Sequence, residues 1–359
     1  MAWIEKRSRT LFDSLDVSAV VLRTSDSFSD SSLSYFTGLP KRFLSGNVLI
    51  LKREKKPLLL KSVLEPNISV PGATVKRVDR KRQFEAILRR ELKGVKKVGI
   101  NRPFHSTASL AALRKTLGKR KLVDVSKQVG KMRAVKSASE ISKIAKACKI
   151  AQNVSKKIPS LYRKGMTEER LALEIEMLLR ERGENELPFP VIVASGAGAR
   201  FPHHVPLRKK ISKGLLLVDF GAFYKNCCSD ITRVFSVGKP KKGQRKLYKA
   251  VFDAKEFAQS LCRPKASFAS VFAETNSLLK KSTGFSLIHG LGHGLGTEVH
   301  DFPSGFLKGS KERLEKGMVL TIEPGIYGSF GGIRVEDDVL VTKRGCKQLT
   351  RAPSKLLEL

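Results

Sequence analysis

The chain has 359 residues, 41% of them hydrophobic, and its 69 lysines and arginines against 33 aspartates and glutamates give a formal net charge of +36. This length is sufficient for a sizeable core and predicts two domains, or one domain with an internal duplication. Because no run of about 18 apolar residues and no apolar signal segment is present, we expect no membrane span and a cytoplasmic location.

The first part of the chain alternates short apolar runs with turns and carries one helical pattern at residues 82–93. The runs are "AVVLRT", "NVLILK", "PLLLK" and "KVGINR". This alternation predicts a small α/β domain over residues 1–130. The segment 124–136 is expected to lead into a second domain, residues 131–359.

The second domain is predicted to repeat one order of elements: two helices, a loop with histidines, and a hairpin. Its first helix begins with the capping-box spacing of Ser137 and Glu140. The second helix is bounded by Thr167 and Gly183. The other expected elements are helices at 244–261 and 268–282 and hairpins at 214–237 and 317–342. The fold class is therefore α/β (α+β), with an internal pseudo-twofold repeat in the second domain.

Each predicted hairpin carries at least one acidic residue on each arm. If the first hairpin reverses at Tyr224 and Lys225, Asp219 and Asp230 lie directly opposite each other, with Cβ atoms about 4.5–5.5 Å apart. Two carboxylates this close require that one is protonated or that a cation lies between them, unless both face water. The apolar sequences "LLLV" and "VF" beside them weigh against water.

The second hairpin gives the same arrangement if it reverses at Ser329 and Phe330, since Glu323 then opposes Glu336. If the two halves pack face to face, four carboxylates converge. An oxygen-rich site of this kind suits two divalent cations.

Histidines gather near these hairpins: five of the six lie between residues 203 and 300, namely His203, His204, His289, His293 and His300. Three of them belong to the stretch "IHGLGHGLGTEVHDFP". Its glycines follow a G-x-G-x-G-x-G order, whereas a dinucleotide-binding loop requires G-x-G-x-x-G between a strand and a helix. The stretch is therefore interpreted as part of a metal site and not as a phosphate loop.

Taken together, "VDFGAFYKNCCSDITRVF", "GHGLGTEVHDFP", "TIEPGIY" and "GIRVEDDVLV" resemble the pita-bread metallopeptidases, the group of prolidase, aminopeptidase P and methionine aminopeptidase. The likeness covers about residues 135–359. Residues 1–130 resemble the creatinase/prolidase N-terminal domain, with a Tyr-x-x-Gly loop at Tyr35 and Gly38. This resemblance implies hydrolysis of peptide bonds preceding proline by a hydroxide that bridges two divalent metal ions.

The resemblance also implies a role for each site residue. The implied metal ligands are Asp219, Asp230, His293, Glu323 and Glu336, with Asp230 and Glu336 bridging both ions. Glu323 is the implied base, while His203 and His300 would contact substrate and the developing oxyanion. Arg334, included among the substrate-binding residues, would hydrogen-bond the metal-site carboxylates. The resemblance implies no ligand role for His289, which is expected to support the site or the fold.

Several choices stay open at this stage. The substrate class is a proline-containing peptide, cleaved by an Xaa-Pro dipeptidase or by an aminopeptidase P. The metals expected are Mn or Co, with Fe or Zn as alternatives, and the resemblance implies a homodimer. The competing hypothesis is a pita-bread scaffold that binds nucleic acid through its +36 charge.

Two compositional features are given a plain interpretation. The basic runs at 52–56, 76–83 and 238–246 are expected on loops or polar helix faces, and aromatic residues make up only 7% of the chain. The five cysteines form no Cys-x-x-Cys pair, so neither a disulfide framework nor cysteine-ligated zinc is expected. The neighbours Cys227 and Cys228 are interpreted as packing residues.

Overall fold

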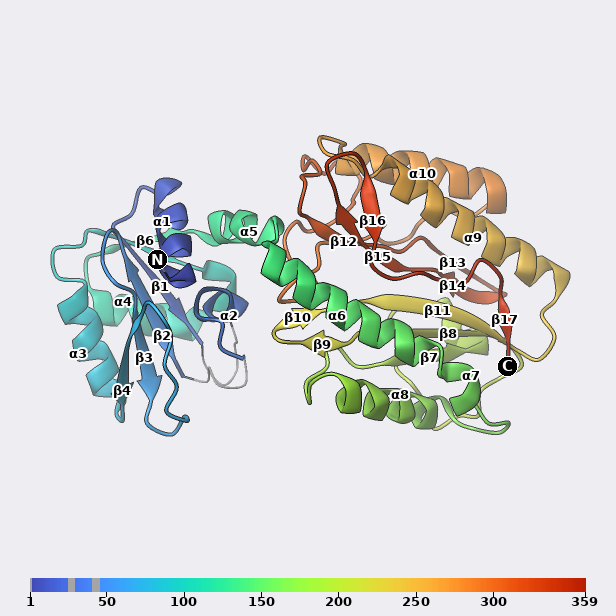
Figure 1. Cartoon of the computed structure of the whole chain (residues 1–359), viewed down its shortest axis with the longest axis horizontal. Coiled ribbons are helices and arrows are strands. Elements are labelled where there is room, and N and C mark those ends of the chain that lie inside the picture. Colours follow the sequence, from blue (N-terminus) through green and yellow to red (C-terminus); the bar gives the residue numbers. More distant parts are fainter. Residues whose placement is uncertain (1, 25–29, 41–45) are drawn as a thin grey trace. The chain divides into compact units, whose positions relative to one another are not determined.

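The computed structural model describes residues 2–24, 30–40 and 46–359. Its contacts divide the chain into two compact units, Met1–Arg133 and Ala134–Leu359 (Figure 1). The predicted boundary after residue 130 lies inside helix α5 (Ser126–Ala134), three residues before this division. Each unit has its own sheets and its own cores.

The first unit is built on one six-stranded mixed sheet in the order β4-β3-β2-β1-β5-β6. Its strands are β1 (Ala19–Arg23), β2 (Val48–Lys52), β3 (Leu58–Ser62), β4 (Thr74–Val78), β5 (Lys97–Ile100) and β6 (Lys121–Asp124). The predicted runs form β1, β2, β3 and β5. Strands β4 and β6 were not predicted, because "TVKRV" and "KLVD" are short and carry charged residues.

Helices cover both faces of this sheet. Val20 and Leu22 of β1 lie in a core with α1 (Trp3–Asp13), α2 (Ser31–Thr37) and α5. Val21, which points to the other face, packs with residues of α3 (Lys81–Glu91) and α4 (Thr107–Leu117). The alternation follows the two-residue period of a strand, so a strand buried on both faces is apolar throughout.

Two predictions for this unit need correction. Tyr35 lies in helix α2 and not in a loop, and Gly38 ends that helix in the left-handed conformation, with φ of 73°. Residues 25–29 of the same motif lie outside the described residues. The basic run at 76–83 was expected on loops or helix faces, but Lys76 and Arg77 lie on β4, the edge strand of the sheet. Charged side chains on an edge strand oppose pairing with another chain.

The second unit repeats one order of elements, as the sequence predicted. Its first half contains α6 (Ala138–Ser155), α7 (Ile158–Leu161), α8 (Glu168–Arg182), β7 (Ile192–Ser195), the 3-10 turn η3 (Gly196–Arg200), β8 (Gly214–Phe220), β9 (Phe223–Tyr224), β10 (Cys227–Cys228) and β11 (Ile231–Val237). Its second half contains α9 (Lys242–Leu261), α10 (Phe268–Thr283), β12 (Val319–Ile322), β13 (Gly325–Gly328), β14 (Gly331–Arg334), β15 (Asp337–Val341), β16 (Cys346–Gln348) and the C-terminal β17 (Leu357–Glu358). In each half, two long helices precede a loop with histidines and a hairpin, and the first half has the short α7 in addition.

Local capping signals set the ends of the helices as predicted. The Ser137 hydroxyl accepts a hydrogen bond from the Glu140 N–H, and the Glu140 carboxylate accepts one from the Ser137 N–H. Thr167 caps the start of α8 through its side chain, and Gly183 follows the last residue of that helix. These caps satisfy N–H groups that have no partner within the helix.

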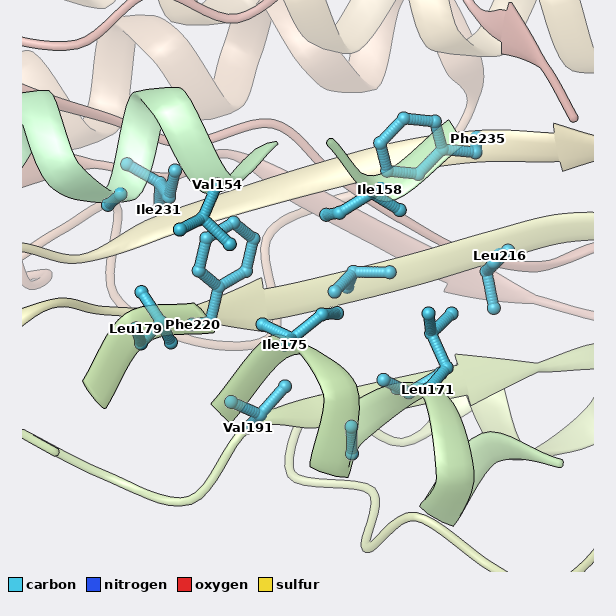
Figure 2. Packing of buried hydrophobic residues seen from close by; sticks show 14 of the residues in the cluster. Val154, Ile158, Leu171, Ile175, Leu179, Val191, Leu216, Phe220, Ile231 and Phe235 are labelled. Carbon is cyan, nitrogen blue, oxygen red and sulfur yellow. The ribbon is translucent and has the colours of Figure 1, made fainter. Parts of the chain in front are cut away.

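Helices α6, α7 and α8 pack on one face of the sheet that contains β8 and β11 (Figure 2). The shared core includes fully buried side chains from all five elements, among them Val154, Ile158, Ile175, Phe220 and Ile231. Burying each such side chain stabilises the fold by about 1.5–3 kcal/mol. Because Phe220 points into this core, its neighbour Asp219 points to the opposite face of the sheet.

The remaining expectations concern cysteines and membrane spans. All five cysteines are free, and Cys227 and Cys228 are buried in an apolar cluster with Cys148. The interpretation of Cys227 and Cys228 as packing residues is confirmed. Within the described part of the chain, no helix combines the length and the apolar character that crossing a bilayer requires.

Candidate functional site

The register of the first hairpin differs from the prediction by two residues. Asp219 lies opposite Thr232, and the reversal centres on Lys225 and Asn226. Both turn residues have positive φ, 47° and 63°, as a tight hairpin turn requires, and asparagine tolerates this conformation well. Asp219 and Asp230 are therefore diagonal neighbours on the sheet, and the predicted direct opposition was wrong.

The second hairpin has the predicted register. Gly325 pairs with Arg334 in the ladder of β13 and β14, and Ile322 pairs with Asp337 in the ladder of β12 and β15. Both ladders share one register, and Glu323 and Glu336 stand opposite each other in the break between them. Because residues opposed across antiparallel strands project to the same face, both glutamates line the same pocket.

The two hairpins and the glycine-rich loop bring their polar side chains together. Ligand atoms of Asp230, His293 and Glu336 all lie within 4.8 Å of one another. Glu323 Oε1 and Asp230 Oδ2 are each 3.5 Å from His293 Nε2. These residues and Asp219 line a pocket of about 630 Å³. All five side chains predicted as metal ligands thus face one pocket.

The backbone around His293 fixes the orientation of its ring. Nδ1 lies 3.1 Å from the carbonyl oxygen of Gly294, and since a carbonyl only accepts, Nδ1 carries the hydrogen. In the neutral ring Nε2 then presents a lone pair to the carboxylates. The preceding Gly292 has φ of 151°, and a Cβ at this position would lie 2.0 Å from the carbonyl oxygen of Thr321. Only glycine fits there.

Arg334 links two of the carboxylates. Its Nη2 donates to Asp219 Oδ2 at 2.5 Å, and its Nε donates to the Thr232 hydroxyl at 2.9 Å. Thr232 in turn donates to Glu336 Oε2 at 2.7 Å. Further hydrogen bonds from Nη1 to Tyr327 and to the Pro202 carbonyl direct four of the five N–H hydrogens at protein atoms. The contacts of Arg334 therefore favour carboxylate orientation over substrate binding.

His289 belongs to the same hydrogen-bonded system. Its Nδ1 donates to the Gly290 carbonyl at 2.7 Å, so Nε2 accepts from the Tyr327 hydroxyl at 3.0 Å. Burial raises the pKa of Tyr327 to about 12, which keeps its proton in place for this bond. His289 thus supports Arg334 through Tyr327, and its Nδ1 lies 4.0 Å from Glu323 Oε2.

Burial dominates the electrostatics of the site. It raises the pKa of Asp230 and of Glu336 well above their usual ranges, and neighbouring carboxylates act in the same direction. Burial also raises the pKa of Asp219, although the Arg334 guanidinium opposes the change. Among the described residues that line the pocket, Arg334 is the one with a permanent positive charge. If all four carboxylates ionised, one guanidinium would leave an excess of negative charge that protons or cations must offset.

His203 and His300 lie at the open side of the pocket, and both side chains are exposed. The His300 ring centroid is 4.3 Å from that of His293. Burial of part of the ring lowers the pKa of His300, and His293 lowers it further. His300 is therefore neutral near pH 7 and keeps one N–H for donation.

Sequence reasoning missed Thr232 and Tyr327. Thr232 lies two residues after Asp230, so the strand period places its hydroxyl on the same face, and this signal was available. Tyr327 lies half-buried between Arg334 and His289, and it contacts both only because the second hairpin and the glycine-rich loop meet. No sequence pattern predicts such a contact.

The donor set fits divalent cations. Asp219 Oδ1 is buried and, within the described residues, has no hydrogen-bond partner. A buried oxygen without a partner is costly, and a cation would satisfy it. Carboxylate oxygens with one imidazole lone pair suit Mn²⁺, Co²⁺, Fe²⁺ or Zn²⁺. A bound cation would also offset the repulsion among the four neighbouring carboxylates.

Models of two protein families match this chain. The creatinase/prolidase N-terminal domain matches residues 6–135, and metallopeptidase family M24 matches residues 142–343. The chain is 37% identical over 269 residues to the uncharacterized peptidase YqhT of Bacillus subtilis, covering 74% of this chain and 76% of that protein. It is 36% identical over 241 residues to the Xaa-Pro dipeptidase of Pyrococcus furiosus, covering 66% of this chain and 68% of the relative.

Solved structures agree over nearly the whole chain. The prolidase from Pyrococcus horikoshii OT3 superposes with a TM-score of 0.86 and 29% identity, covering 97% of this chain and 99% of that one. The X-Pro aminopeptidase from Thermotoga maritima MSB8 has the same TM-score and coverage with 27% identity. The similarity therefore extends over both units.

Proposed function

The chain belongs to metallopeptidase family M24, and on this premise we propose that it hydrolyses the peptide bond preceding a proline residue, as an Xaa-Pro dipeptidase or an Xaa-Pro aminopeptidase. The family depends on a dinuclear centre of divalent metal ions. The observation that carries the proposal is the buried group of Asp230, His293 and Glu336, whose ligand atoms lie within 4.8 Å of one another.

We assign the metal ligands to the five side chains that converge in the pocket: Asp219, Asp230, His293, Glu323 and Glu336. The proposed metals are Mn or Co, with Fe or Zn as alternatives, because this donor set does not choose among them. When bound, the ions would polarise the scissile carbonyl and lower the pKa of a shared water to near neutrality.

Glu323 is the proposed general base. It is the half-buried member of the four carboxylates, whereas the other three are buried, so it meets water in the pocket. Oε1 faces His293, and Oε2 lies on the side of His289. Oε2 would take a proton from the attacking water and return it to the leaving amine.

His300 and His203 are the proposed donors to the oxygen on which negative charge develops. A neutral imidazole N–H provides this stabilisation without adding positive charge to the pocket. Arg334 is assigned a supporting role, since its hydrogen bonds to Asp219 and Thr232 orient the carboxylates. This replaces the earlier expectation that Arg334 contributes to substrate binding.

Proline release provides the test of the proposal. The purified chain with Mn²⁺ or Co²⁺ should cleave Met-Pro, an Xaa-Pro-Yaa tripeptide, or both. Cleavage of the dipeptide alone would identify a dipeptidase, and cleavage of the tripeptide alone an aminopeptidase. Absence of cleavage of either peptide with every one of the four metals would refute the proposal.

Asp230→Ala should abolish metal-dependent cleavage while the fold stays intact. A matched control is Asp253→Ala, which removes an exposed aspartate paired with Lys249 on α9. The control should retain wild-type activity. Nothing in the site's geometry or in the comparisons supports the alternative of a nucleic-acid-binding scaffold, which rested on the net charge of +36 alone.

A further inference from the structure

Glu168 is a buried carboxylate that lies apart from the proposed metal ligands. It is the first residue of α8, and only 1% of its surface is exposed. Burying a carboxylate is costly unless hydrogen bonds compensate. The partners of Glu168 therefore show which part of the chain it holds.

Four donors converge on this carboxylate from two other segments. Oε1 accepts from the backbone N–H and the hydroxyl of Ser195, at 2.8 Å and 2.7 Å. Oε2 accepts from His204 Nε2 at 2.8 Å and from the Leu207 N–H at 3.3 Å. Glu168 thus connects the start of α8, the end of β7 and the loop 201–207. We call Glu168 and His204 the clamp.

The His204 ring is enclosed as well as hydrogen-bonded. A Cβ added to Gly198 would lie 2.6 Å from its Cε1, so the ring packs directly on the backbone of η3. Because the carboxylate of Glu168 is held by three other donors, Nε2 of His204 carries the hydrogen that it donates. The ring therefore has one defined position.

The loop 201–207 has little else to hold its centre. Its apolar side chains are largely solvent-exposed, at 64% for Phe201, 72% for Val205 and 50% for Leu207. Its ends are tied by the hydrogen bond from Arg334 to the Pro202 carbonyl and by the contacts of Leu207. Between these ends, His204 is the side chain that anchors the loop to the buried interior.

His203 stands directly before the clamped histidine and lines the catalytic pocket. Among the described residues, none forms a hydrogen bond with its ring, so the position of His203 depends on the backbone that carries it. We propose that Glu168 and His204 are positioning residues that hold His203 over the reacting carbonyl. This inference rests on the proposed function, in which His203 contacts substrate.

A double-mutant cycle tests the coupling. Glu168→Gln leaves one accepting oxygen for the four donors, which weakens the clamp, so kcat/KM at saturating Mn²⁺ should fall by about ten-fold. In a His203→Ala background, the same substitution should change kcat/KM by less than about two-fold. An equal loss in both backgrounds, or no loss in the wild-type background, would overturn the inference.

The neighbouring Glu169 offers a matched control. It lies one residue further along α8, is partly exposed, and pairs with the exposed Arg208. Glu169→Gln should leave kcat/KM and Mn²⁺ affinity unchanged. Mn²⁺ affinity should also be unchanged in Glu168→Gln, because the clamp contains none of the proposed ligands.

Two variants of His204 separate the hydrogen bond from packing. His204→Phe keeps a ring against Gly198 but loses the donor, and it should lower kcat/KM as Glu168→Gln does. His204→Gln keeps an N–H donor and should restore most of the activity. If His204→Phe is as active as the wild type, the clamp does not position His203.

Hydrogen exchange gives a readout that does not depend on the substrate. The Leu207 N–H should exchange faster in Glu168→Gln than in Glu169→Gln. A wild-type enzyme without activity on proline peptides would refute the proposed function, whereas equal exchange in the two variants would refute the clamp. The two failures are therefore distinguishable.

Discussion

Asp219 Oδ2 accepts a hydrogen bond from Arg334 at 2.5 Å, while Oδ1 of the same carboxylate is buried and unpaired within the described part of the chain. One oxygen is therefore fixed by a permanent positive charge, and the other is left for a different partner. Burial raises the pKa of Asp219, and Arg334 opposes this change, so the guanidinium favours the ionised carboxylate. An ionised, oriented carboxylate with one free oxygen is what a cation requires.

Replacement of Arg334 by lysine should therefore weaken metal binding. A lysine ammonium is a point charge that cannot hold Asp219, Thr232 and Tyr327 in the geometry of a planar guanidinium. We expect about 10–100-fold lower Mn²⁺ affinity in Arg334→Lys, measured by titration calorimetry. The control is Arg344→Lys, the same substitution at an exposed arginine, and this variant should bind Mn²⁺ as the wild type does. Equal affinities in the two variants would contradict the role given to Arg334.

Gly292→Ala should destabilise the second unit strongly. The residue has φ of 151°, and an added Cβ would lie 2.0 Å from the Thr321 carbonyl oxygen, so both the conformation and the space exclude alanine. We expect a loss of about 3 kcal/mol or more in the free energy of unfolding, together with loss of Mn²⁺ binding through displaced His293.

Gly243→Ala is the control for this change. Gly243 lies in α9 with open space around its Cα, so alanine should leave stability unchanged or raise it by about 0.5–1 kcal/mol. Denaturant unfolding of both variants checks the prediction. A Gly292→Ala protein as stable as Gly243→Ala would show that the loop accommodates a side chain.

The stability of the first unit should depend on pH through Asp30. This carboxyl caps α2 by accepting from the Ser32 N–H at 2.8 Å, and burial raises its pKa from 3.8 to about 6. Between these pH values the folded state binds the additional proton, so stability falls as the pH rises from about 4 to about 6. By pH 7 the loss amounts to roughly 3 kcal/mol.

Asp30→Asn removes this titration. Asparagine keeps an oxygen that accepts from Ser32 and Asn101, as Oδ1 of Asp30 does. Unfolding of the first unit, followed from pH 4 to pH 7, should show a smaller decline in stability for the variant than for the wild type. Parallel curves would mean that Asp30 titrates near its ordinary pKa in the folded chain.

The sequence predicted the second hairpin better than the first, and the turns explain why. Glycines at 328, 331 and 332 mark the reversal of the second hairpin, so the opposition of Glu323 and Glu336 was predicted correctly. In the first hairpin Lys225 and Asn226 form the turn, and only Asn226 signals a positive φ. The observed turn lies one residue further along the chain than the predicted turn, and this changes the pairing of the two strands by two residues.

Contacts between segments that are distant in the chain could not be predicted from the sequence. The pairing of Glu168 with His204 spans 36 residues and depends on how α8 meets the loop after β7. The bond from Tyr327 to His289 likewise joins two segments that only the folded sheet brings together. Residue types and spacing identified candidate ligands, but they did not predict the side chains that hold those ligands in place.

The central claim is that the converging carboxylates and His293 hold divalent metal, and thermal unfolding of the wild type and Asp230→Asn tests it most directly. With a chelator, Asp230→Asn should melt at the higher temperature, because one buried, mutually repelling carboxylate is gone. With excess Mn²⁺ the order should reverse, since binding at 100 times Kd stabilises the wild type by about 2.7 kcal/mol. A wild type that gains no stability from Mn²⁺, or a variant that gains as much, would contradict the account.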